Sequence, residues 1–75
     1  MNKFEKHPIV KRFRKAYEYL VYNEKVKNKT EFAKKLEMQR TSVGESMSGK
    51  RLPSIAMIGA LHHKFGVNTN YIFWY

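Results

Sequence analysis

The chain has 75 residues, no cysteine and a formal net charge of +9. This length fits one small domain with a modest core, and the lack of cysteine excludes a disulfide framework and a cysteine-based zinc site. No apolar run is long enough to cross a membrane and no signal peptide is predicted, so we expect a soluble, cytoplasmic protein with no membrane partner, and the charge favours a polyanion such as nucleic acid.

The first predicted helix follows seven residues, 1–7, that we expect to form a flexible basic arm. Pro8 suits the first turn of a helix. The apolar residues after it recur on one side at helical spacing: Ile9, Phe13, Ala16, Tyr17 and Leu20. We therefore expect an amphipathic helix that begins at Pro8, reaches Tyr22 or beyond, and packs this apolar stripe into the core.

A second predicted helix begins at Asn28, whose side chain can accept hydrogen bonds from the amides of the first turn. Glu31 has the capping-box position, from which its carboxylate can reach the Asn28 amide. The apolar residues of this helix share one face: Phe32, Ala33 and Leu36. Glu37 then falls in a tight turn, where we expect a left-handed backbone although the residue is not glycine.

The third predicted helix covers residues 40–47, and a step of about 100° per residue gives it two different sides. One side carries Arg40, Thr41, Gly44, Glu45 and Ser48, and the other carries Val43, Ser46 and Met47, with Ser42 at the border. Apolar anchors behind and hydrogen-bonding groups in front are typical of the recognition helix of a helix-turn-helix. Gly49 is expected to end the helix in a left-handed conformation.

Ser54 is predicted to cap a fourth helix, which Gly66 ends. The apolar residues of this helix recur at helical spacing: Ile55, Ile58, Leu61 and Phe65. Asn68 is expected to cap a short last helix over 69–75. No run alternates with the period of a strand, so we predict an all-α fold of five helices, with 8–75 as a single domain.

The stretch TEFAKKLEMQRTSVGESMSGKRLPS resembles the helix-turn-helix of the phage-repressor and Cro-type (lambda-repressor-like) family. The matching residues are Glu31, Phe32, Ala33, Leu36, Met38, Thr41, Val43, Gly49, Lys50, Arg51, Pro53 and Ser54. The chain departs from the family pattern at two positions. At Glu37 the family prefers glycine, and at Ser46 the family buries an aliphatic residue. The resemblance extends over roughly residues 9–75 and implies a compact lambda-repressor-like domain.

The resemblance implies a transcriptional regulator, most simply a repressor, that binds double-stranded DNA sequence-specifically in a bacterium or in the cytoplasm of a phage host. Its third helix, residues 40–47, would enter the major groove. The alternative is an antitoxin, or another interaction module of a toxin–antitoxin pair, that binds DNA secondarily. Neither interpretation requires a cofactor or a small-molecule ligand.

Five positions of the third helix are predicted to contact bases: Arg40, Thr41, Ser42, Gly44 and Glu45. Arg40 can form a bidentate fork with guanine, or bind a phosphate instead. Thr41 and Ser42 can bond a base, a phosphate or their own first turn. Gly44 has no side chain to hold the helix away from the groove floor. Glu45 can accept a hydrogen bond from cytosine N4, or repel the DNA when the helix lies in a wrong register. It can also hold Arg40 or Arg51 in place.

Five other positions are predicted to contact DNA phosphates: Asn28, Lys29, Ser48, Lys50 and Arg51. Lys29 lies at the start of the second helix, where free amides and the helix dipole favour an anion. All but one of the 15 Lys and Arg residues lie at or before Arg51, which places the charge with this segment. Such contacts supply affinity and register but little sequence information.

The aromatic end of the chain consists of Tyr71, Ile72, Phe73, Trp74 and Tyr75, which is more apolar surface than a short helix can bury. Part of it is expected to close the core. The remainder is expected to form a weak homodimer on a palindromic operator, as the last helix of the resembling family often does. The other interpretation is that the chain is the DNA-binding portion of a longer protein.

Enzymatic and metal sites find little support in the sequence. The chain has no aspartate, and its adjacent His62 and His63 point about 100° apart on a helix, so they cannot share one metal ion. A hydrolytic Ser/His/acid set lacks an evident third member. We therefore expect neither an enzyme nor a metal protein.

Overall fold

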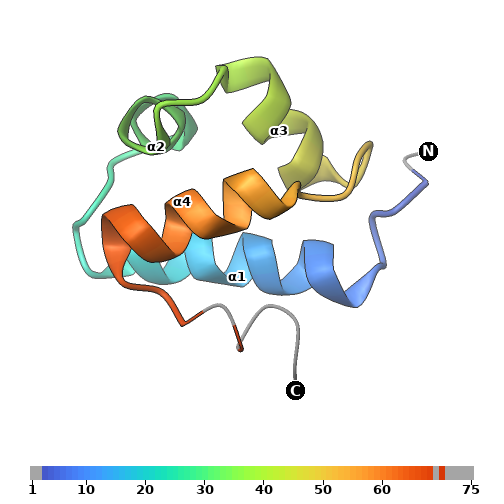
Figure 1. Cartoon of the computed structure of the whole chain (residues 1–75), viewed down its shortest axis with the longest axis horizontal. Helices are drawn as coiled ribbons and strands as arrows, with labels where there is room; N and C mark the ends of the chain where they lie inside the picture. The colour runs from blue at the N-terminus through green and yellow to red at the C-terminus, as the bar shows by residue number, and fades with distance from the viewer. Residues whose placement is uncertain (1–2, 69, 71–75) are drawn as a thin grey trace.

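The computed structural model describes residues 3–68 and Asn70, and within them every regular element is helical. The helices are α1 (Pro8–Tyr22), α2 (Lys29–Leu36), α3 (Arg40–Ser48) and α4 (Ile55–Phe65). In the view of Figure 1, α2 and α3 lie above α1 and α4. The α3 helix contacts both α1 and α2, and α2 also contacts α4.

The predicted all-α class is confirmed, with four helices in the described part of the chain. The predicted fifth helix, 69–75, falls almost wholly on residues outside that part. Within residues 3–68, no helix has the length and apolar character needed to cross a membrane.

Phe32 lies at the centre of the core and has no exposed surface. Its ring centroid lies 5.1 Å from that of Tyr17, 5.9 Å from Phe13 and 6.0 Å from Phe65. Aromatic pairs at these separations add about 0.5–1.5 kcal/mol beyond their buried area. The Phe32 side chain of α2 thus joins α1 to α4. The apolar stripe predicted for α1 is confirmed, since Phe13, Ala16 and Leu20 are buried.

Ile55 shares the helical spacing of Ile58, Leu61 and Phe65, but 83% of its surface is exposed. The buried side of α4 is formed by Met57, Ile58 and Leu61. At about 100° per residue, Ile55 projects to the edge of that side, where no other described helix covers it. The three-residue spacing between Ile55 and Ile58 therefore does not place Ile55 on the buried side of the helix.

The capping box of α2 is formed differently from the prediction. Asn28 Oδ1 accepts from the Glu31 amide at 2.9 Å, as expected for an N-cap. The Glu31 carboxylate, however, accepts from the amide of Lys27, at 3.1 Å, and not from that of Asn28. Because the chain enters α2 extended at Asn28, with φ −159° and ψ 179°, the carboxylate reaches one residue further back.

The turn between α2 and α3 has the left-handed residue that was predicted, because Glu37 has φ 59°. Its amide and that of Met38 return to the carbonyls of Lys34 and Ala33, each at 3.0 Å, which closes the end of α2. The Glu37 carboxylate pairs with Lys64 near the end of α4. The hydrogen bond and the charge of Lys64 lower the pKa of Glu37 below its ordinary value.

Residues 3–7, the described part of the expected flexible arm, form a turn beside the end of α3 (Figure 1). The Phe4 amide donates to the Gly49 carbonyl at 2.7 Å, and His7 Nδ1 accepts from the Ile9 amide at the start of α1. Gly49 has φ 89°, as predicted, and a Cβ atom there would lie 2.3 Å from the Glu5 Cα. Glycine is therefore required at this position both by the left-handed turn and by the close approach of Glu5.

Candidate nucleic-acid interface

The α3 helix has the two different sides that its sequence predicts. Its buried residues are Val43, Ser46 and Met47, none more than 2% exposed. On the other side Arg40 and Thr41 are exposed. Burial of Ser46 means that a hydroxymethyl group occupies the centre of the buried side, where an aliphatic residue would remove more apolar surface from water.

Arg14 of α1 fixes the far end of α3. Its Nε and Nη2 atoms donate to the Met47 carbonyl at 3.0 Å and 2.8 Å. A carbonyl in the last turn of a helix has no partner within the helix, and it lies at the negative end of the helix dipole. The guanidinium therefore donates hydrogen bonds to the Met47 carbonyl and offsets the partial negative charge at the end of α3. These bonds also join α3 to α1. No sequence pattern indicates this contact of Arg14.

A hollow of about 260 Å³ lies where the starts of α2 and α3 approach each other. It is lined by Lys29, Arg40, Thr41 and Gly44. Gln39, the N-cap of α3, makes no side-chain hydrogen bond to the helix, in contrast to Asn28 on α2. The hollow is thus lined by two cationic residues and lies at the start of a helix whose first amides have no side-chain cap, which is the chemistry that binds an anion.

This hollow brings together residues from both predicted groups. Arg40, Thr41 and Gly44 were expected to contact bases, and Lys29 was expected to contact a phosphate. Ser42, a predicted base contact, is half-buried and does not line the hollow. Asn28, a predicted phosphate contact, already uses its side-chain oxygen to cap α2, so its amide nitrogen is the group left to meet a ligand.

The loop after α3 is folded onto the carbonyl oxygen of Glu45. That oxygen accepts from the amides of Gly49, Lys50 and Arg51, at 3.1, 2.9 and 3.3 Å. The hydroxyl of Ser48 also donates to it, at 3.2 Å. Three predicted phosphate contacts, at positions 48, 50 and 51, are therefore held together at the end of α3.

The Glu45 side chain pairs with both cations of this loop. Its Oε1 lies 3.1 Å from Arg51 Nε, and its Oε2 lies 3.4 Å from Lys50 Nζ. The Glu45 side chain is 21% exposed, whereas those of Lys50 and Arg51 are 64% and 70% exposed. Of the roles that the sequence left open for Glu45, the geometry supports the holding of Arg51, and it adds Lys50, which sequence reasoning missed.

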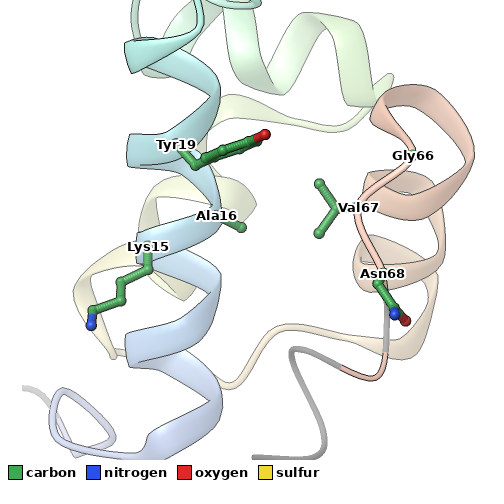
Figure 2. A pocket seen from close by; sticks show the side chains of 6 residues that line it. All are labelled: Lys15, Ala16, Tyr19, Gly66, Val67 and Asn68. Carbon is green, nitrogen blue, oxygen red and sulfur yellow. The ribbon is translucent and has the colours of Figure 1, made fainter.

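A second hollow, of about 400 Å³, lies between α1 and the segment that follows α4. Its lining residues are Lys15, Ala16, Tyr19, Gly66, Val67 and Asn68, and Figure 2 shows Ala16 and Tyr19 facing Val67 across it. None of the predicted base or phosphate contacts lies there. The predicted dimer contacts, Tyr71, Ile72, Phe73, Trp74 and Tyr75, are outside the described residues.

No group of three or more His, Cys, Asp or Glu side chains is placed to hold a metal ion in the part of the chain that the structure describes. Comparison of the chain with protein-family models, with curated proteins and with solved structures gave no match. The function is therefore inferred from the residues of the chain itself.

Proposed function

We propose that the protein is a sequence-specific DNA-binding regulator, most simply a repressor, that acts in the cytoplasm of a bacterium or phage host. In this proposal α2 and α3 form a lambda-repressor-like helix-turn-helix, and α3 enters the major groove. The observation that carries the proposal is the hollow at the starts of α2 and α3. Its lining combines an arginine, a hydroxyl and a glycine, which suit base edges, with a lysine, which suits a phosphate.

The chemistry of this hollow suits the edge of a major groove. Arg40 reaches from the first turn of α3, where a fork of donors can meet guanine O6 and N7. Lys29 starts α2, where the same approach would bring a backbone phosphate against a helix N-terminus. The loop at the end of α3 supplies Lys50 and Arg51 for two further phosphates. A short helix anchored at both ends in this way can fix the register of its base contacts.

The proposal includes a weak homodimer through residues 71–75, as the family resemblance implies. A two-fold dimer would place two copies of α3 in successive major grooves, about 34 Å apart, and would read a palindromic operator. Doubling the base contacts in this way compensates for the few that one short helix can make.

The test of the proposed function is selection of bound sequences from random duplex DNA, followed by affinity measurement at several salt concentrations. We expect a palindromic motif to be enriched. If Lys29, Lys50 and Arg51 each neutralise one phosphate, raising salt from 50 to 200 mM should weaken the binding of one subunit to one half-site roughly 40-fold. Affinity that does not change with salt would contradict the phosphate contacts. Failure to enrich any sequence, together with tight binding of a neighbouring gene's product, would favour the antitoxin alternative.

A pair of glycine substitutions separates groove contact from helix stability. A Cβ atom at Gly44 in α3 or at Gly59 in α4 would meet no atom within 4 Å beyond its chain neighbours and the backbone of its own helix. Alanine at either position should therefore stabilise the fold by about 1 kcal/mol, as in other helix interiors. We expect Gly44→Ala to weaken binding to the selected DNA, because its methyl group would face the groove floor, and Gly59→Ala to leave binding unchanged. Denaturation and affinity measurements on both variants test this, and unchanged binding by Gly44→Ala would remove Gly44 from the interface.

A further inference from the structure

We infer that Glu45 is a specificity-determining residue, because it withholds Lys50 and Arg51 from phosphates unless α3 is seated on its correct sequence. The inference rests on the proposed DNA-binding function. The Glu45 side chain would couple the loop that carries Lys50 and Arg51 to the base contacts of α3. Both loop cations are within ion-pair distance of the two oxygens of this carboxylate.

The pairing is built into the backbone as well as the side chains. The carbonyl of Glu45 accepts from the amides of Lys50 and Arg51, so the loop returns to the same residue that its cations contact. The carboxylate is the least exposed of the three charged groups, at 21%. Ion pairs between fully exposed groups contribute little, but here the loop is folded with its cations already beside the anion, which reduces the entropy that pairing costs.

Seating α3 in a groove changes what surrounds this carboxylate. Glu45 lies about 40° from Thr41 around α3, at about 100° per residue. In the proposed complex it would face base edges while its two cations turn towards phosphates. A carboxylate left there without partners is repelled by the DNA. A cytosine N4 amino group is a donor that can replace the lost cations, whereas the oxygen of a thymine or guanine is an acceptor and cannot.

The base that faces Glu45 therefore decides whether the loop cations are released. On the correct site the carboxylate bonds to the base, and Lys50 and Arg51 are free to bind phosphates. On a wrong site the carboxylate keeps its cations, and the protein makes fewer phosphate contacts. Specificity then arises from a penalty at wrong sites, in addition to attraction at the right one.

The salt dependence of binding tests this coupling, because each phosphate contact contributes about 0.9 to the slope of log affinity against log salt. The changes in slope below are those for each bound subunit. We expect Glu45→Gln to bind random duplex DNA more tightly than the wild type, with a slope steeper by about 1.8. On the selected site the two proteins should have the same slope, since both use the loop cations there. The ratio of selected-site to random-DNA affinity should fall in the variant.

Glu37→Gln is the matched control, because Glu37 is also an ion-paired glutamate and its loss changes the net charge equally. If this control steepens the slope on random DNA as much as Glu45→Gln, the effect is one of total charge and the inference is wrong. An identical slope for Glu45→Gln and wild type on random DNA would also overturn it.

A second variant tests the coupling without changing Glu45. The double substitution Lys50→Gln, Arg51→Gln should reduce the slope by about 1.8 on the selected site and leave it unchanged on random DNA. Equal reductions on both DNAs would show that the loop cations always bind phosphate, and would overturn the inference while leaving DNA binding itself intact. If the wild type binds no duplex DNA, the proposed function has failed instead.

Discussion

Replacing Arg14 with methionine should lower the free energy of unfolding by about 1.5–3 kcal/mol, the range for hydrogen bonds to a charged group. The variant keeps an unbranched apolar stem but loses both donors to the Met47 carbonyl. The Met47 carbonyl lies in the last turn of α3. The variant therefore leaves this carbonyl without a donor, and it also leaves the negative end of the helix dipole without the nearby positive charge. Chemical denaturation followed by circular dichroism measures the change.

The same substitution should weaken DNA binding, although Arg14 lies on α1 and is not among the predicted DNA contacts. Without the guanidinium, the end of α3 and the loop that carries Lys50 and Arg51 lose the hydrogen bonds that join them to α1. The control is Lys11→Met, which removes an equal charge from an exposed position of the same helix. If both variants lose stability and affinity equally, the effect of Arg14 is one of charge, and its contact with α3 contributes little.

Replacing Arg40 with alanine should cost about 1–3 kcal/mol of binding free energy on the selected DNA site. This corresponds to roughly a 5-fold to 150-fold loss of affinity. The loss should be largest where the site has the preferred base pair, and the variant should tolerate substitution of that pair, because a guanine would lose its bidentate partner. Binding to each single-base-pair variant of the site measures both effects.

Lys29→Ala is the control for Arg40, since the two side chains line the same hollow and carry the same charge. Lys29 is predicted to contact a phosphate, so its removal should weaken all sequences by a similar factor and reduce the salt slope by about 0.9. A uniform loss for Arg40→Ala as well would assign Arg40 to the phosphate contacts.

Local signals in the sequence account for most of the fold. Pro8 and Ser54 begin helices, and Glu37, Gly49 and Gly66 end them in left-handed conformations, as predicted. These outcomes depend on the residue and its near neighbours, because a cap or a positive φ is decided within one turn. The two sides of α3 were predictable for the same reason, since a helical period assigns each residue a direction.

Contacts between distant residues could not be predicted in this way. Arg14 is one of several cations on α1, and no local pattern shows that it meets a carbonyl 33 residues later. The pairing of Glu37 with Lys64 depends on how α4 packs against α2. At the candidate site, the helical period predicted the side of α3 on which Glu45 lies. It did not predict the partners of Glu45, because the path of the following loop decides which residues meet it.

The contact of Phe4 and Glu5 with Gly49 also has a consequence for the order in which the chain folds. Residues 3–7 leave the ribosome early, but their partner is made only after α3 is complete. Bringing together residues so far apart in the chain costs loop-closure entropy that the local contacts within a helix do not, so this contact should form late. A contact near the end of the chain that forms late should also open before the helices do. The end of α3 can therefore be uncovered by a local opening while the four helices stay folded.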